Sequence, residues 1–117
     1  MTLDELMKLV LGALEDLKAQ NIQVLDVHDL TTITERMVIC SGTSSRQVKG
    51  LADNLVKEAK HHGHPPIGVE GADAAEWILV DLGDVVVHIM HVQARLFYQL
   101  EKLWDIKQVK AAEAADE

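Results

Sequence analysis

The chain has 117 residues, the size of one domain and too short for two ordinary ones. Its 11 Lys and Arg residues against 19 Asp and Glu residues give a formal net charge of −8, which disfavours non-specific binding to DNA or RNA and allows a basic protein partner. An apolar fraction of 48% excludes a chain that is disordered throughout.

The first element is an amphipathic helix. Leucine, methionine and valine side chains recur every three or four residues near the N-terminus, which places them on one face over about four turns. Thr2 precedes this stripe and Glu5 follows three residues later, which is the spacing of a capping box. We therefore predict a helix over residues 2–20, with Asn21 at its end.

Two extended segments and a second helix follow. β-branched residues predict strands at 22–28 and 36–40, and the short connection between them favours antiparallel pairing. A second apolar stripe begins after Ser44, which has the position of a helix cap with Gln47 at the capping-box spacing. This helix is expected to end at Gly63 and the two prolines that follow it.

The second half of the chain predicts three more strands and a last helix. Residues 67–71 have a weak strand pattern, whereas residues 76–82 and 84–90 are strongly apolar and are separated by Gly83, which suits a tight turn. Helical spacing returns over residues 92–104. The predicted order is therefore one helix, two strands, one helix, three strands and one helix.

This order predicts one α+β domain, built on a mixed α/β sheet of about five strands flanked by helices, because hairpins are combined with a helical crossover. The domain is expected to span residues 1–106, followed by an acidic, disordered tail at 107–117. The single cysteine, Cys40, excludes an internal disulfide and a thiolate metal cluster. Without an apolar run of the roughly 20 residues that span a bilayer, or a basic secretory start, we expect a cytoplasmic protein.

The segment 41–45, with the sequence Ser-Gly-Thr-Ser-Ser, leads from a strand into a helix and has a geometry that can hold a phosphate. It resembles the Gly-Ser turn of nucleotidyltransferases, which follow it with two magnesium-binding carboxylates on one strand. The strands here offer no such pair, because Asp81 and Asp84 bracket a turn and are expected to shape it. We therefore predict no catalytic residue, no cofactor and no enzymatic activity.

Other reactive side chains also have simpler interpretations. His61, His62 and His64 follow the second helix, where they suit the negative end of the helix dipole, and their spacing fits no standard metal site. Cys40 lies at the end of a predicted strand and is interpreted as a small, half-buried side chain rather than a nucleophile. No metal is predicted.

The two strong strands are apolar on both faces. If they pair as a hairpin, Trp77, Leu79, His88 and Met90 share one face, while the opposite face packs against helices. Either both faces are buried, or one leaves an exposed apolar patch that binds a partner. Tryptophan, tyrosine and methionine are the residue types expected to anchor an interface.

Together these residues resemble the ribosomal silencing factor S, or Iojap-like, family. The resemblance covers residues 2–106 and is carried by Trp77, by 81–90 (Asp-Leu-Gly-Asp-Val-Val-Val-His-Ile-Met) and by 95–104 (Arg-Leu-Phe-Tyr-Gln-Leu-Glu-Lys-Leu-Trp). Residues 41–48 and the Val-Glu-Gly at 69–71 match in the same order. The resemblance implies a nucleotidyltransferase-like fold without the catalytic carboxylates.

The resemblance also implies a function. Members bind the large ribosomal subunit through universal large-subunit protein fourteen and sterically block joining of the small subunit, which damps translation when nutrients are short. The alternatives are a nucleotidyltransferase-type nucleotide-binding enzyme and a metal-binding or dimerisation module. We expect no direct nucleic-acid readout and no membrane partner, and a homodimer of the free protein remains open.

The expected partner-binding surface combines the shared strand face with the last helix. Its apolar centre is formed by Trp77, Leu79, Met90 and Tyr98, while Trp104 is expected in the core. Polar contacts near the edge come from Arg95 and Glu101, and helical spacing places Glu101 next to Tyr98. Asp81 or Asp84 is expected to pair with basic groups of the partner. The full set of expected contact residues is Trp77, Leu79, Asp81, His88, Met90, Arg95, Tyr98 and Glu101.

Overall fold

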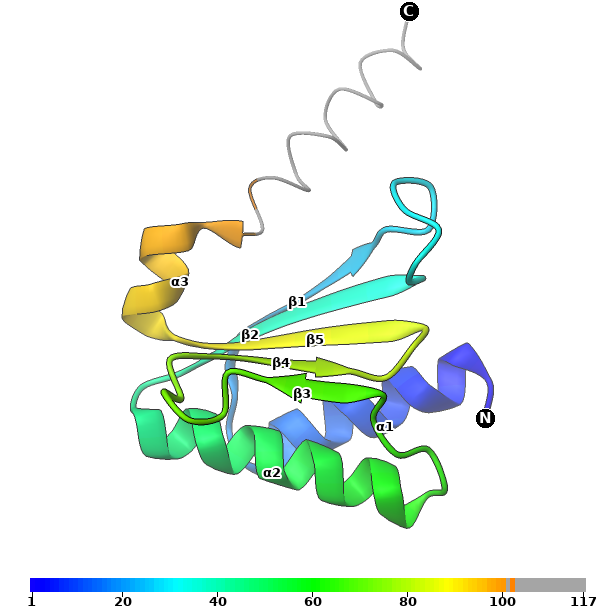
Figure 1. Cartoon of the computed structure of the whole chain (residues 1–117), viewed down its shortest axis with the longest axis horizontal. Helices are drawn as coiled ribbons and strands as arrows, with labels where there is room; N and C mark the ends of the chain where they lie inside the picture. Colours follow the sequence, from blue (N-terminus) through cyan, green and yellow to red (C-terminus); the bar gives the residue numbers. More distant parts are fainter. Residues whose placement is uncertain (101, 103–117) are drawn as a thin grey trace, which may run out of the picture.

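The structure, a computed structural model, describes residues 1–100 and 102 (Figure 1). The element order confirms the sequence prediction: α1 (Leu3–Asp16), β1 (Gln20–Asp26), β2 (Arg36–Gly42), α2 (Ser45–His61), β3 (Gly68–Glu70), β4 (Trp77–Asp81), β5 (Val85–His91) and α3 (Val92–Tyr98). None of the helices in the described residues is long and apolar enough to cross a membrane.

The predicted capping box of α1 is confirmed. The Thr2 hydroxyl accepts a hydrogen bond from the Glu5 backbone N–H at 3.2 Å, and the Glu5 carboxylate accepts one from the Thr2 backbone N–H at 3.4 Å. The helix ends at Asp16, earlier than predicted, because Lys18 turns the chain with a φ of 62°. Asn21, predicted as the helix end, lies in β1 with a φ of 49°.

The Ser44 cap of α2 is confirmed by a hydrogen bond of 3.1 Å from the Gln47 N–H to the Ser44 hydroxyl. The Gln47 side chain does not complete a capping box and instead accepts from the Thr43 N–H at 2.7 Å. Its amide group also donates to the carbonyls of Leu17 and Lys18, at 3.3 and 3.2 Å. One glutamine therefore joins the start of α2 to the turn after α1.

The sheet has the strand order β1-β2-β5-β4-β3 and is mixed, as predicted. β1 and β2 are antiparallel, β2 and β5 are parallel, and β5, β4 and β3 pair antiparallel. The one parallel pair places the carboxyl ends of β2 and β5 side by side. The chain leaves these ends into α2 and α3, which brings the two helix starts close together.

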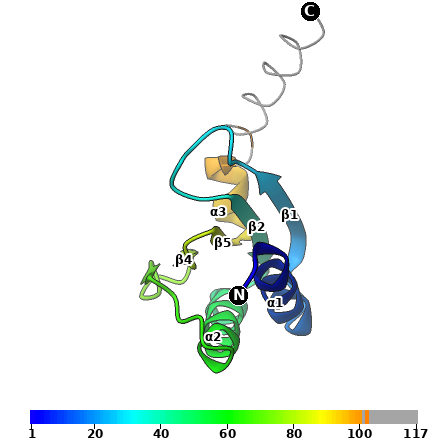
Figure 2. The ribbon, with the colours of Figure 1, turned by 90° about the vertical axis from the view of Figure 1, so that its right-hand side faces the viewer.

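The two faces of the sheet are covered to different extents. α1 and α2 lie together on one face, and α3 lies on the other (Figures 1 and 2). The larger core cluster fills the α1–α2 side and includes the strand residues that sequence alternation predicted to face helices: Ile78, Val80, Val85, Val87 and Ile89. The smaller cluster on the α3 side is made of Leu25, Val27, Met37, Ile39 and Met90, with Trp77, Ala94 and Leu100 packed against it.

The last helix is shorter than the predicted 92–104. α3 ends at Tyr98 because Gln99 adopts a left-handed conformation with φ 49° and ψ 46°, and its N–H donates to the Arg95 carbonyl at 2.9 Å. The helical spacing that placed Tyr98 next to Glu101 is therefore interrupted between the two. Glu101, Trp104 and the predicted tail at 107–117 lie outside the described residues.

Candidate interaction surface

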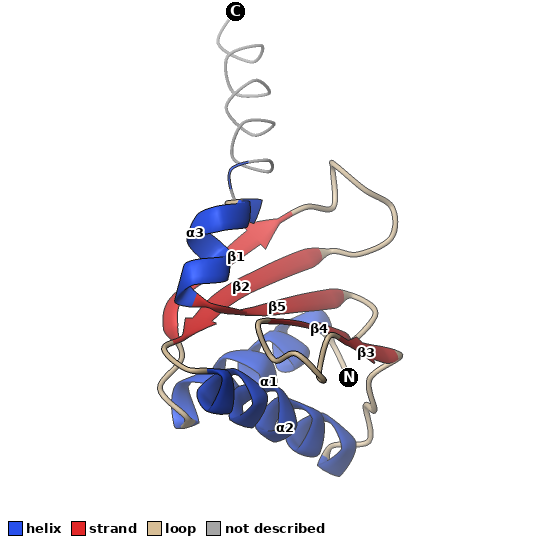
Figure 3. Ribbon diagram, turned by 60° about the vertical axis from the view of Figure 1, so that its left-hand side comes forward, coloured by secondary structure: helices blue, strands red, loops and turns tan. Residues whose placement is uncertain are grey.

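Exposed aromatic side chains of α3 lie next to Trp77 of β4, on the sheet face that α3 partly covers. Figure 3 shows α3 on the opposite side of the sheet from α1 and α2. The ring of Trp77 is 4.9 Å from that of Tyr98, and Tyr98 is 5.0 Å from Phe97 in an edge-to-face contact. Phe97 is 81% exposed and Tyr98 is 55% exposed, while Trp77 and Leu79 are partly exposed on β4. We call Trp77, Leu79, Phe97 and Tyr98 the Trp77 surface.

His88 supports this surface from beneath. It pairs with Leu79 across the β4–β5 ladder and is only 6% exposed. Its Nδ1 accepts a hydrogen bond of 3.0 Å from the Trp77 indole N–H, which fixes the indole against the sheet. Burial lowers the pKa of His88 to about 4, so the ring is neutral at pH 7 and carries its proton on Nε2.

Met90 lies elsewhere than predicted. It pairs with Trp77 across the ladder, but it is fully buried in the smaller core cluster under α3. Its side chain therefore has no surface to offer a partner in this structure and instead packs the floor beneath Trp77. The sequence pattern correctly placed Met90 on the same strand face as Trp77, but α3 covers the Met90 end of that face.

Arg95 was predicted to make polar contacts at the edge of the interface, and the structure places it inside the fold. The side chain is 7% exposed, and its guanidinium donates to the Asn21 carbonyl at 2.6 Å and to the Ser41 hydroxyl at 3.0 Å. These bonds hold α3 to the ends of β1 and β2. Because Tyr98 follows one turn later, Arg95 positions the helix that carries part of the Trp77 surface.

The acidic candidates have different surroundings. The Asp81 carboxylate accepts from the Gly83 N–H at 2.9 Å, which confirms the prediction that it shapes the β4–β5 turn. Asp84 joins the same turn to β2, because its carbonyl accepts from the N–H groups of Glu35 and Arg36 at 2.9 and 3.0 Å. Asp81 pairs with Val86 and lies on the same sheet face as Leu79, at the far end of β4 from Trp77.

Phe97 was missed by the sequence prediction. A signal was available, since residues 96–98 are three consecutive apolar side chains and a helix cannot turn all three toward one face. Phe97 and Tyr98 line a cavity of about 300 Å³ with Glu76 and Ser45. Leu96, which is 72% exposed, lines a different cavity of about 640 Å³ beside Arg95.

The segment 41–45 forms a tightly packed helix start. A Cβ on Gly42 would lie 3.0 Å from a methyl carbon of Val48, so the turn leaves little room at this position. Side chains already accept from the N–H groups of Thr43 and Gln47, which a phosphate would otherwise use. Among the described residues there is also no group of three His, Cys, Asp or Glu side chains placed to hold a metal ion.

Cys40 is fully buried and burial raises the pKa of its thiol to about 12, so the thiolate that a nucleophile requires is suppressed at neutral pH. The histidines after α2 contact backbone oxygen atoms. His62 Nδ1 lies 2.9 Å from the Glu58 carbonyl, and His64 Nε2 lies 2.8 Å from the Leu82 carbonyl. These contacts anchor the end of α2.

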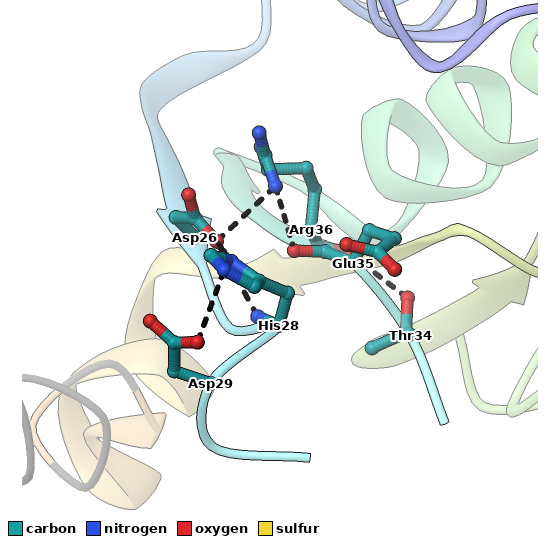
Figure 4. A network of polar contacts seen from close by, with 6 residues as sticks. All are labelled: Asp26, His28, Asp29, Thr34, Glu35 and Arg36. Carbon is teal, nitrogen blue, oxygen red and sulfur yellow. Dashed lines mark hydrogen bonds and ion pairs between the residues drawn. The ribbon is translucent and has the colours of Figure 1, made fainter. Parts of the chain in front are cut away.

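A charged network closes the β1–β2 connection (Figure 4). The two ring nitrogens of His28 contact the Asp26 and Asp29 carboxylates at 2.5 and 3.0 Å, and Arg36 contacts Asp26 at 3.1 Å. The hydrogen bond with Asp26 raises the pKa of His28, and the same bond lowers the pKa of Asp26. This network was not predicted, because Arg36 reaches it from beyond the β1–β2 turn, and the sequence does not reveal the shape of that turn.

Comparison with known proteins decides the family. A family model described as "Ribosomal silencing factor during starvation" matches residues 1–117. The chain belongs to this family. The ribosomal silencing factor of Haemophilus influenzae is 50% identical over 99 residues, covering 85% of this chain and 97% of that protein.

Two further similarities support membership of the silencing-factor family. A crystal structure from Chromobacterium violaceum has a TM-score of 0.87 and 44% identity, and the match covers 90% of this chain and 88% of that one. A mouse protein named "Mitochondrial assembly of ribosomal large subunit protein 1" is 36% identical, over 85% of this chain and 45% of that protein. The family match includes residues 107–117, which the sequence analysis placed outside the resemblance.

Membership gives the chain a ribosome-associated silencing role. The family name describes silencing and no reaction. A nucleotidyltransferase-type activity finds no support in the helix start at 41–45, whose N–H groups are already bonded to side chains.

Proposed function

We propose that the chain is a translational repressor that binds the large ribosomal subunit through universal large-subunit protein fourteen and thereby blocks joining of the small subunit. The observation that carries this proposal is the Trp77 surface. Exposed, contiguous apolar side chains mark interaction sites, and Trp and Tyr are the types enriched at the centres of interfaces. In a family of ribosomal silencing factors, the ribosome is the partner to consider first.

The net charge supports a basic ribosomal protein as the direct contact. A chain with a formal charge of −8 approaches a basic surface faster than a neutral one does, and the attraction acts over about 10 Å at 0.1 M salt. The name of the mouse relative refers to the large ribosomal subunit, which agrees with this partner. We therefore expect the association rate to fall as salt is raised.

The mechanism needs bulk and affinity rather than chemistry. A folded domain fixed on the joining face of the large subunit occupies space that the small subunit requires. The family description refers to starvation, which supports repression under nutrient limitation. We expect this repression to take place in the cytoplasm. In the free protein, the same apolar surface is available to join two copies as a homodimer.

The residues take two kinds of role in this proposal. Trp77, Leu79 and Tyr98 contact the partner, with Phe97 added to the predicted set. His88 and Arg95 act as positioning residues, because one holds the indole and the other holds α3. Met90 packs beneath the surface, and Asp81 and Glu101 remain candidates for polar contacts at its edge.

Neighbouring residues of α3 give a matched test. Phe97→Ala and Tyr98→Ala each remove an exposed aromatic ring from the Trp77 surface, whereas Leu96→Ala removes an exposed side chain that lines the other cavity. We expect each aromatic variant to weaken binding to purified large subunits by about 30-fold, the equivalent of 2 kcal/mol at an interface anchor. Leu96→Ala should bind like the parent.

Binding is measured by sedimentation with large subunits, and subunit joining by light scattering after small subunits are added. Thermal unfolding checks that all three variants retain the stability of the parent, since these side chains are mostly exposed. The proposal is wrong if both aromatic variants bind and block joining as well as the parent does. Equal losses in the Leu96 variant would also contradict the assigned surface.

A further inference from the structure

A groove lies between α2 and the edge strand β3, on the side of the sheet that α1 and α2 cover. It has a volume of about 670 Å³ and is lined by Asp53, Val56, Lys57, Lys60, His61 and Val69. Val69 pairs with Val80, whose side chain belongs to the α1–α2 core, so the groove is on the opposite face from the Trp77 surface. We call it the α2–β3 groove.

One wall of the groove is a free sheet edge. β3 is the last strand in the sheet order, so one side of its backbone has no strand partner within the described residues (Figure 3). Its register with β4 is regular from Gly68 to Glu70. The opposite edge differs, because β1 has a register shift between Gln20 and Gln23 that disrupts further pairing.

The floor of the groove is apolar. Val56 of α2 is partly buried and Val69 of β3 is 41% exposed. Ile67, immediately before β3, is 75% exposed. Branched apolar side chains next to a free strand edge suit an extended chain that pairs with the edge and lays alternate side chains on them.

The helical wall of the groove is cationic. Lys57, Lys60 and His61 are all exposed, and neither lysine forms an ion pair with a carboxylate of the described residues. The one carboxylate of the lining, Asp53, is contacted by Lys49 at 3.6 Å. This local excess of positive charge stands in a chain with a formal charge of −8. An occupant with negative charge is therefore favoured.

We propose that the α2–β3 groove binds an extended acidic peptide segment of a partner protein. The segment adds to β3 as a further strand, with apolar side chains on Val56 and Val69 and carboxylates toward Lys57 and Lys60. A peptide is favoured over RNA, because phosphates would engage the lysines but leave the strand edge and the valines without partners. The groove and the Trp77 surface lie on different faces, so both can be occupied together.

The test uses the full chain labelled with ¹⁵N and a short peptide of repeating Val-Thr-Glu-Thr as the probe, because this spacing puts valine and glutamate on the same face of the added strand. Peptide binding should shift the backbone amide signals of residues 56–61 and 67–70. The double variant Lys57→Glu/Lys60→Glu should weaken binding at least about tenfold. The control Lys8→Glu/Arg46→Glu makes the same change of net charge at two exposed helix positions outside the groove, and it should retain the parent's affinity.

Three outcomes overturn the proposal. A peptide of repeating Val-Thr-Lys-Thr that binds equally well would show that the cationic wall does not select the ligand. Competition by polyuridine RNA at lower concentration than the acidic peptide would identify the groove as an RNA contact. Amide shifts confined to other residues, or absent at millimolar peptide, would show that the edge of β3 does not accept a strand.

Discussion

The buried His88 predicts a specific sensitivity to acid. In the unfolded chain a histidine binds its proton near its usual pKa of 6.5, whereas burial lowers the pKa of His88 to about 4 in the folded protein. Between these two values the unfolded chain holds more protons than the folded one. The free energy of unfolding therefore rises with pH in this window. The part of it that depends on neutral His88 is lost as pH falls from 6.5 toward 4.

The size of the effect follows from the two pKa values. Each unit of difference corresponds to about 1.4 kcal/mol, so His88 alone removes about 2 kcal/mol by pH 5 and about 3 kcal/mol by pH 4. Because the residue is only 6% exposed, solvent screening reduces this little. Domains of this size are stable by only about 5–15 kcal/mol, so the loss is easily measured.

His88→Gln isolates the effect. A glutamine oxygen can accept the Trp77 N–H but does not titrate, so the variant should lose about 2 kcal/mol less than the parent between pH 7 and pH 5. Urea unfolding followed by circular dichroism at each pH gives the comparison. Contributions from Asp26 and Glu5, whose pKa values are lowered by hydrogen bonds to His28 and Thr2, are common to both proteins.

His28→Gln is the control of opposite sign. Its hydrogen bond with Asp26 raises the pKa of His28, so its stabilisation is present at low pH and is lost as pH rises through the folded-state pKa. Removing it should leave the acid-induced loss unchanged or larger. If His88→Gln shows the same pH dependence as the parent, the buried neutral histidine is not the source and the reasoning fails.

Substitutions at two further positions, Arg95 and Gly71, test how the fold holds the Trp77 surface, and Gly12 serves as a control. Arg95→Met leaves the Asn21 carbonyl and the Ser41 hydroxyl without the guanidinium donor and should lower the free energy of unfolding by about 2–3 kcal/mol, with Arg95→Lys intermediate. Urea unfolding equal to the parent would contradict the role given to Arg95. Gly71→Ala should cost at least about 2 kcal/mol, because Gly71 has a φ of 85° and a Cβ there would lie 2.1 Å from the Trp77 carbonyl oxygen. Gly12→Ala in α1, where a Cβ would meet nothing within 4 Å, should instead stabilise by up to about 1 kcal/mol, and a calorimetric melting temperature distinguishes the two glycines.

The order of elements was predictable because each signal is local. Helical periodicity, strand alternation and the caps at Thr2 and Ser44 depend on neighbours within a few residues. The end of α3 was not predictable in this way. The helical spacing of apolar residues continues to residue 104, and no glycine marks the left-handed conformation that Gln99 adopts.

For the candidate contact residues, the sequence predicted which sheet face they share but not how deeply each is buried. Alternation along β4 and β5 correctly placed Trp77, Leu79, His88 and Met90 on one side of the sheet. Which of them is exposed depends on where α3 crosses that side, and the sequence holds no local signal for this. A charged residue such as Arg95 is normally expected at the surface. Its burial depends on acceptors that the fold places within its reach, among them the Asn21 carbonyl and the Ser41 hydroxyl.

The unequal covering of the sheet by the described helices supports the proposal that the Trp77 surface is preformed for binding. Two long helices bury one face, but the seven residues of α3 contact β5 and β2 and do not extend over all of β4. The part left open carries an indole whose N–H is already bonded to a neutral histidine. A partner that covers Trp77 therefore need not satisfy or desolvate that donor, which removes a cost that buried polar groups usually impose on binding. Because α3 and the indole are held in place before contact, little conformational entropy is lost on association, so the proposed repressor can act by occupying the joining face alone.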